Sequence, residues 1–144
     1  ETTPLTTYDV VIGDAFGGPA VPWHLTTREF VESFAARMKP GGFYVLNLID
    51  NPPLGFARAQ ATTLAAVFQH VLVLAPPSYL AGESGGNFVL VAGNESFDVD
   101  GLSAALMDRG SSSVVLPLED LDRFIGDADI LTDDFAPVDQ LITN

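Results

Sequence analysis

The chain has 144 residues and no cysteine. This absence excludes disulfide scaffolds, thiolate zinc sites, iron–sulfur clusters and cysteine nucleophiles. A chain of this length buries roughly 70% of its unfolded surface, so it can fold without covalent cross-links. Apolar residues make up 47% of the sequence and charged residues 17%, which is typical of a globular protein. We therefore expect one domain over residues 1–144.

Long apolar runs are also missing. None approaches the roughly 18 residues of a membrane span, and the first four residues, Glu-Thr-Thr-Pro, resemble neither a signal peptide nor a natural start. We expect a cytoplasmic protein whose present segment does not contact a membrane. We also expect the chain to be a piece of a longer polypeptide.

Basic side chains are scarce. Six Lys and Arg face 19 Asp and Glu, which gives a net charge of −13, and 12 of the acidic residues fall in residues 91–144. This charge repels the phosphates of nucleic acids and of anionic lipids, so we expect no nucleic-acid partner. Two interpretations of the acidic residues stay open: a solvated surface, or attraction of a cationic substrate.

Support for common catalytic motifs is weak. The Gly-x-Ser-x-Gly match at residues 82–86 lies in a loop that leads into a predicted strand, not in a strand-to-helix turn, so serine hydrolysis has no support. His24 and His70 are too far apart in the sequence for a metal-ligand spacing, and we expect no metal. No Gly-x-Gly occurs either.

Short apolar runs predict the strands of a buried sheet. Residues 8–14, 43–49 and 71–74 are rich in β-branched or large apolar side chains, and helical patterns separate them. This alternation predicts parallel strands. The loop at 76–86 is too short for a crossover helix, so the strand at 87–92 should run antiparallel to its neighbour. The fold class is therefore α/β, with one antiparallel strand and helices on both faces.

Helix boundaries follow from capping patterns. Thr26 and Glu29 have the spacing of a capping box, which predicts that a helix begins there. The helix should stop before residues 40–42, Pro-Gly-Gly. A second, alanine-rich helix is predicted over 55–69, and shorter helices are predicted over 101–109 and 119–124.

Three polar residues follow successive predicted strands. Asp14 and Asp50 close the first two strands, and Tyr79 lies in the loop after the third. Ligands of open parallel sheets bind outside the carboxyl ends of the strands, so we expect all three side chains at one edge. A carboxylate there can accept a proton or hold a cation, and the rings of Tyr79 and Trp23 suit a positive group. The alternatives are that both Asp residues cap loops and that both rings are packing residues.

The motifs, taken in order, resemble a known family. Residues 8–14, then Leu-Thr-Thr-Arg-Glu-Phe at 25–30, then Met-Lys-Pro-Gly-Gly at 38–42, resemble the second half of a class I methyltransferase-type Rossmann domain. Within that superfamily, Pro-Ser-Tyr at 77–79 and Leu-Thr-Asp-Asp-Phe-Ala-Pro-Val-Asp at 131–139 resemble the spermidine synthases. The resemblance covers nearly the whole chain.

The resemblance implies a reaction and a site. Such enzymes move an aminopropyl group from decarboxylated S-adenosylmethionine to putrescine. Asp14 matches the first Asp of the family's Asp-x-x-Asp motif and would be the base and amine anchor, while Asp14 and Ala15 would contact the adenosyl co-substrate. Tyr79 matches a substrate-side tyrosine, and we expect Asp50 and Trp23 beside the substrate. The second Asp of the motif is replaced by Gly17, which makes putrescine itself doubtful.

The resemblance also implies a missing half. Family members bind the adenosyl group through a glycine-rich turn after their first strand, and this sequence has none. We therefore expect the carboxyl-terminal half of a catalytic domain, inactive alone, that forms a homo-oligomer or joins an amino-terminal half. Two other functions stay open: a methyltransferase that uses S-adenosylmethionine, and a non-catalytic binding or dimerisation module that kept the fold.

Overall fold

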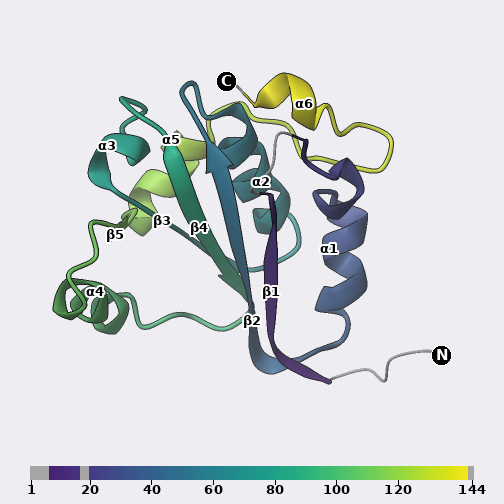
Figure 1. The fold of residues 1–144 in the computed structure, drawn as a ribbon. Helices are drawn as coiled ribbons and strands as arrows, with labels where there is room; N and C mark the ends of the chain where they lie inside the picture. Colours follow the sequence, from purple (N-terminus) through teal and green to yellow (C-terminus); the bar gives the residue numbers. More distant parts are fainter. Residues whose placement is uncertain (1–6, 17–19, 143–144) are drawn as a thin grey trace.

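A computed structural model describes residues 7–16 and 20–142. Five strands form one sheet in the order β1-β2-β4-β3-β5 (Figure 1). β1 runs parallel to β2, whereas β4 lies antiparallel between β2 and β3, and β5 is antiparallel to β3. The strands are β1 (Tyr8–Phe16), β2 (Met38–Asp50), β3 (His70–Ala75), β4 (Gly86–Gly93) and β5 (Val114–Val115).

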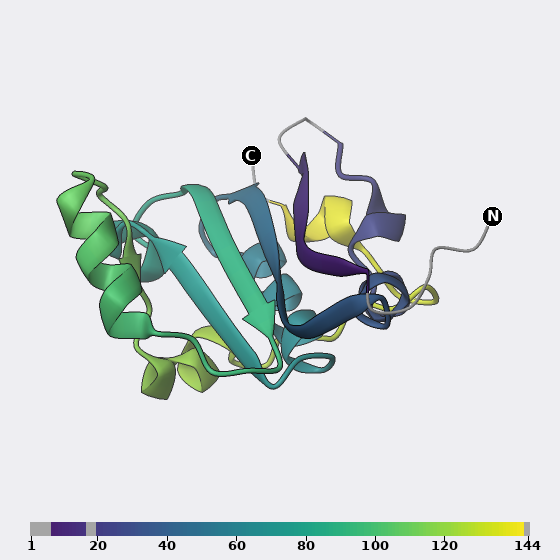
Figure 2. The same ribbon diagram turned by 90° about the horizontal axis from the view of Figure 1, so that it is seen from below.

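The helices connect these strands and lie around the sheet. Figure 2 shows α4 at one end of the sheet and β1 with α1 at the other. The helical segments are η1 (Trp23–Leu25), α1 (Arg28–Ala35), α2 (Gly55–Ala65), α3 (Pro77–Leu80), α4 (Val99–Asp108), η2 (Leu118–Asp120), α5 (Leu121–Ile125) and α6 (Val138–Leu141). In the described residues, no helix combines the length and the apolar character needed to cross a bilayer.

The predicted fold class is confirmed. The sheet is α/β with an antiparallel strand at the predicted place, because the connection between β3 and β4 holds only the single turn α3 and is too short to cross the sheet. β4 therefore returns beside β3 and enters the space next to β2.

One face of the sheet is closed by helices. Side chains alternate along a strand, so every second residue of β2 and β4 points the same way. On this closed face Leu46, Leu48, Phe88 and Leu90 are fully buried, in one core cluster with apolar residues of α1 and α2. This face holds most of the apolar core.

The opposite face is largely open. It carries Val10 and Ile12 of β1, Val45 of β2 and Val89 of β4. Phe97 and Leu102, just before and within α4, line a shallow apolar cleft of about 390 Å³ over the β3 and β4 side. α4 does not reach β1, where Val10 is 43% and Ile12 73% exposed. We call this side the open face.

The start of α1 differs from the predicted capping box. The N-cap is Thr27, whose Oγ1 accepts a hydrogen bond from the Phe30 amide (3.2 Å). The hydroxyl of Thr26 instead donates to the Trp23 carbonyl (2.6 Å), closing η1. Two adjacent threonines can each cap, and the short turn before the helix engages the first one.

Two other predicted boundaries were wrong. β2 begins at Met38, so Pro40, Gly41 and Gly42 lie inside the strand rather than in a break before it. Gly41 has a φ of 77°, which a glycine adopts without a steric penalty, and the pairing with β1 is irregular there. α2 ends at Ala65, four residues before the predicted end.

The acidic end of the chain is tied into the core. Leu131 is fully buried; its carbonyl accepts from the Arg28 amide (2.7 Å) and its amide donates to Thr63 Oγ1 (2.9 Å). The hydroxyl of Thr27 donates to the carboxylate of Asp133 (2.7 Å). The Leu-Thr-Asp-Asp segment therefore packs as structure against the start of α1 and against α2.

Candidate functional site

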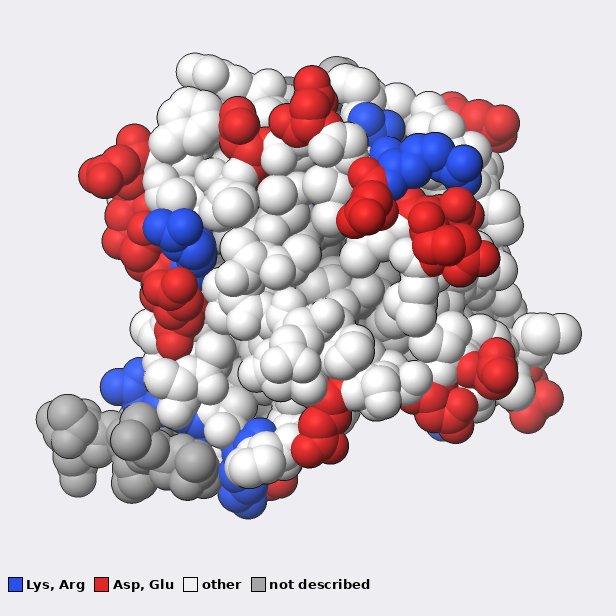
Figure 3. Space-filling model, turned by 180° about the vertical axis from the view of Figure 1, so that it is seen from behind, with Lys and Arg blue, Asp and Glu red and all other residues white. Residues whose placement is uncertain are grey.

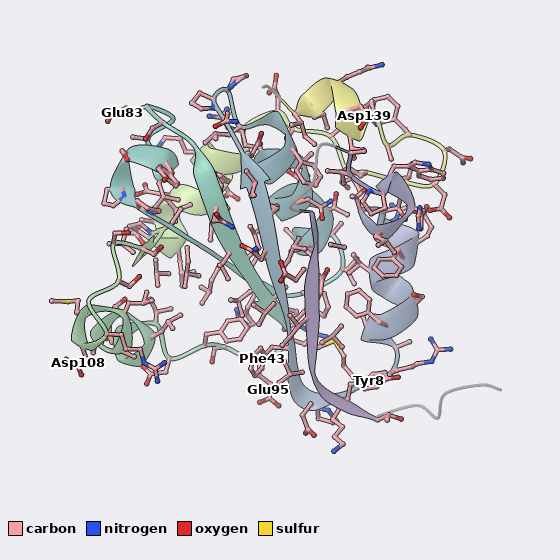
Figure 4. All side chains as sticks on the ribbon, in the orientation of Figure 1. Tyr8, Phe43, Glu83, Glu95, Asp108 and Asp139 are labelled. Atoms are coloured by element: carbon pink, nitrogen blue, oxygen red, sulfur yellow. The ribbon has the colours of Figure 1, made fainter. Side chains whose placement is uncertain are left out.

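The carboxyl ends of β1, β2 and β3 lie at the same edge of the sheet, the one at which these strands end, as their directions require. Because β4 runs the other way, its first residues, Gly86 and Asn87, join this edge as well. Figure 4 shows Glu83 and Asp139 at this end of the molecule, with Tyr8 and Phe43 at the opposite end. The elements that carry Asp14, Asp50 and Tyr79 thus converge on one edge.

Asp14 is exposed near the end of β1. Its Oδ1 accepts a hydrogen bond from the side-chain amide of Asn47 on β2 (3.0 Å). The register between the two strands shifts after Gly13, where β1 is irregular. None of the four ion pairs within the described residues involves Asp14. Its carboxylate therefore keeps an uncompensated negative charge at the surface.

A second amide continues the contact. Asn87 Nδ2, at the start of β4, donates to Asn47 Oδ1 (3.1 Å). The sequence analysis missed both asparagines. The signal was present for Asn47, because a single amide interrupts the otherwise apolar run of residues 43–49.

Asp50 has a different environment. Its side chain is fully buried, and its two oxygens accept hydrogen bonds from the amides of Asn51 and Ala57 (2.9 Å each). Burial raises the pKa of Asp50 because the charged form is desolvated, while the backbone hydrogen bonds and the nearby Arg58 oppose this shift. The carboxylate caps the start of α2, so the geometry favours the capping role over direct contact with a substrate.

Tyr79 is half buried in α3. Its ring lies 5.9 Å from that of Phe88, centroid to centroid, and passes directly over Gly86. A Cβ at Gly86 would stand 2.7 Å from the ring, and Gly86 also has a φ of 153°. Phe88 points to the closed face, so Tyr79 packs on that side of β4 while Asp14 lies toward the open face.

Ala15 and Trp23 are both exposed near Asp14 in the sequence. Asp14 and Ala15 border a cleft of about 170 Å³ between β1 and α1, whose lining includes the Tyr44 ring. Burial raises the pKa of Tyr44 to about 12, so its hydroxyl stays protonated at neutral pH. This cleft is not lined by Asp50, Tyr79 or Trp23, so the expected residues share an edge but not one cavity. Gly17 lies outside the described residues.

The surface charge favours cations. Basic side chains stand beside acidic ones, as in the pairs of Arg28 with Glu29 (3.6 Å) and Arg123 with Asp120 (2.7 Å). Figure 3 shows Lys and Arg (blue) next to Asp and Glu (red) around the rim of the rear face, whose central part is uncharged. Because the sequence has a net charge of −13, the charged side chains left without an opposite partner are mostly acidic. Within the described part of the chain, no three His, Asp or Glu side chains are grouped to hold a metal ion.

Similarity to solved structures clarifies this architecture. A probable spermidine synthase from Corynebacterium glutamicum matches 93% of this chain with a TM-score of 0.80 and 28% sequence identity, and the match covers 50% of that protein. The chain has a partial spermidine synthase-like fold. It spans about half the length of that spermidine synthase.

A second solved structure shares the general fold. Human methyltransferase-like protein 13, in complex with SAH, matches 93% of the chain and 55% of its own length, with a TM-score of 0.51 and 21% identity. This match shows the methyltransferase-type Rossmann fold alone. No family model and no curated protein matches the sequence.

Proposed function

We propose that the protein carrying this chain is an aminopropyltransferase that moves an aminopropyl group from decarboxylated S-adenosylmethionine to a small amine. Asp14 would act as the base. The observation that supports this most is an exposed carboxylate at the carboxyl end of β1 in a spermidine synthase-like fold, whose partner among the described residues is a neutral amide. Such a group can both attract an ammonium ion and take its proton.

The chemistry requires one proton transfer within this chain. When bound, decarboxylated S-adenosylmethionine supplies an aminopropyl carbon beside a sulfonium, whose sulfur leaves as a neutral thioether. The amine nitrogen attacks that carbon with its lone pair, which requires the amine to lose a proton. Asp14 Oδ2, which no described hydrogen bond engages, would accept this proton while Oδ1 stays bound to Asn47. Asp14 and Ala15 fit one side of the co-substrate, since both are exposed at the strand end.

The other expected residues take supporting roles in this proposal. Asp50 holds the start of α2 and so fixes the end of β2. Tyr79 sits over the first residue of β4, and the exposed Trp23 ring, 6.0 Å from His24 and perpendicular to it, is open to a cationic ligand. Of these three side chains, Trp23 is the one that this proposal would place against the substrate.

The remainder of the site has to come from elsewhere. The chain spans half of its structural relative and has no Gly-x-Gly turn, so we propose that a cofactor-binding half, on the same or another polypeptide, joins the free edge of β1. Val10 and Ile12 are exposed on that strand, and in the described residues β1 pairs only with β2. An unpaired apolar edge is suited to strand addition.

A second candidate is methyl transfer from S-adenosylmethionine. Gly17 stands where the aminopropyltransferases carry their second Asp, which removes one expected anchor for a diamine. The scaffold of a methyltransferase with bound SAH also matches the chain. Under this candidate, Asp14 would still bind or deprotonate the acceptor.

Product analysis distinguishes the two. The protein with both halves is incubated with putrescine and either decarboxylated or ordinary S-adenosylmethionine. Aminopropyl transfer predicts spermidine and methylthioadenosine from the first mixture, and methyl transfer predicts a methylated amine and S-adenosylhomocysteine from the second. A panel of mono- and diamines identifies the acceptor. No product in any mixture would favour the non-catalytic module. Cell fractionation would check the expected cytoplasmic location.

A further inference from the structure

Three polar side chains from three different strands are joined in a row. Asn87 of β4 donates to Asn47 of β2 (3.1 Å), and Asn47 donates to Asp14 of β1 (3.0 Å). All three lie on the open face, whose neighbouring positions Val45 and Val89 are apolar. These polar side chains bond to one another across three strands of an otherwise apolar sheet surface.

The row can be oriented in only one way. An ionised Asp14 can only accept hydrogen bonds, so the group of Asn47 that faces it must be the NH2 group. The oxygen of Asn47 then faces β4 and needs a donor, which the NH2 group of Asn87 supplies. Each amide is therefore fixed by the next, and Oδ1 of Asp14 is held in a defined direction.

The donor to Asp14 is neutral, and this sets it apart from the other carboxylate of β1. Asp9 is also exposed, but Lys39 Nζ lies 3.0 Å from its Oδ2 and neutralises it. An amide donor orients a carboxylate and stabilises its charge without cancelling it. Within the described residues, no basic side chain pairs with Asp14, and its Oδ2 is left for a cationic amine.

We propose that Asn47 is a positioning residue for Asp14, and that Asn87 acts only through Asn47 by setting its orientation. This inference rests on the proposed role of Asp14 as base. A carboxylate that must take a proton during attack on the co-substrate needs its free oxygen aimed at the amine, and small displacements of such groups cost large factors in rate. The competing explanation is a cross-strand polar pair that only stabilises the sheet.

Substitutions in the protein with both halves test the order of action. Asn47→Leu keeps the size and removes the donor, and we expect kcat to fall about 10- to 100-fold with an unchanged KM for the adenosyl co-substrate. Asn87→Leu should lower kcat about 3- to 10-fold. The double variant should be no slower than Asn47→Leu, because Asn87 acts through Asn47. Gln140→Leu, an exposed amide on α6, is the matched control and should change nothing.

The outcomes separate this inference from the function on which it rests. If Asp14→Asn leaves turnover unchanged, the proposed function is wrong. If Asp14→Asn is slow but Asn47→Leu is as fast as wild type, or if the two asparagine effects simply multiply, only the positioning role is overturned. In the Asp14→Asn background, Asn47→Leu should cause no further loss of kcat.

A spectroscopic measurement keeps the test independent of activity. The side-chain NH2 resonances of Asn47 should move in Asp14→Asn and in Asn87→Leu, because each variant changes one of its two hydrogen bonds. They should not move in Asp9→Asn, which changes the other carboxylate of the same strand. If the Asn47 resonances do not shift in Asp14→Asn, the contact between Asn47 and Asp14 does not persist in solution, and the proposal is overturned.

Discussion

The two faces of the sheet differ in how their carboxylates are buried and hydrogen-bonded. On the closed face Asp50 is fully buried, and backbone amides engage both of its oxygens. Toward the open face Asp14 is exposed, and one neutral amide engages one of its oxygens. Both residues end successive strands, so the sequence alone makes them look equivalent.

The difference follows from what covers each face. The amide of Ala57, at the start of α2, donates to Asp50, so this carboxylate is already engaged in capping the helix. No helix covers the β1 side of the open face, so Asp14 keeps capacity for a ligand. Asp50 is therefore part of the packed structure, whereas Asp14 is the carboxylate to which the proposed function gives a chemical role.

The largest expected effect is on turnover. Asp14→Asn in the protein with both halves should lower kcat by roughly two to four orders of magnitude, because an amide cannot take the proton of the amine. Steady-state kinetics measure this, and thermal unfolding should show a nearly unchanged midpoint. Asp9→Asn on the same strand is the control and should retain full activity. A large loss of stability in Asp14→Asn would indicate a structural role and contradict the proposed role of Asp14 as base.

The next effect is on association at the free edge of β1. Ile12→Lys should weaken binding to the cofactor half, or self-association of this chain, by roughly 100-fold, because a charge would be buried at the joining edge. Analytical ultracentrifugation or light scattering measures it. Met107→Lys on α4, where the side chain is 79% exposed, is the control and should not alter association. Wild-type chain that is strictly monomeric and does not bind the other half would contradict the joining edge.

A smaller effect concerns the third strand end. Gly86→Ala should destabilise the fold by about 2–3 kcal/mol, because the residue has a positive φ and its methyl group would meet the Tyr79 ring. Gly82→Ala is the matched control: it has a φ of 74° and open space, so only about 1 kcal/mol of backbone strain is expected. Chemical denaturation compares the two. Equal losses would mean that Tyr79 moves freely away from β4.

The smallest effect is a pH dependence on the closed face. Burial raises the pKa of Asp50 above its ordinary value of 3.8, so the folded protein binds this proton more tightly than the unfolded chain. Its contribution to stability is present below pH 3.8 and is lost as the pH rises through the raised pKa. The free energy of unfolding of wild type should therefore fall relative to Asp50→Asn across that window. Parallel pH curves for the two proteins would contradict it.

The sheet was predictable from the sequence because its strands are short apolar runs with clear ends. The reversal of β4 followed from the length of one loop, residues 76–86. The position of the N-cap at Thr27 did not follow, since Thr26 and Thr27 have the same chemistry and only the turn at Trp23 selects between them. The extension of β2 through Gly42 depends on pairing with β1, which local propensity does not contain.

The sequence predicts at which end of the sheet the candidate residues lie, but not on which face of the sheet each of them lies. Strand direction sufficed to bring Asp14, Asp50 and Tyr79 to one edge. The capping contact between Asp50 and the Ala57 amide depends on the packing of α2, which the sequence of residues 50–57 does not reveal by itself. Asn47 and Asn87 lie 40 residues apart, and only the register of β2 against β4 makes them neighbours.

The hydrogen bonds from Thr27 to Asp133 and from the Arg28 amide to the Leu131 carbonyl couple residues 131–133 to the start of α1. Because of these bonds, a displacement of α1 requires residues 131–133 to move with it. α1 also forms one wall of the cleft beside Asp14 and Ala15, so the acidic end of the chain helps to hold that wall in place.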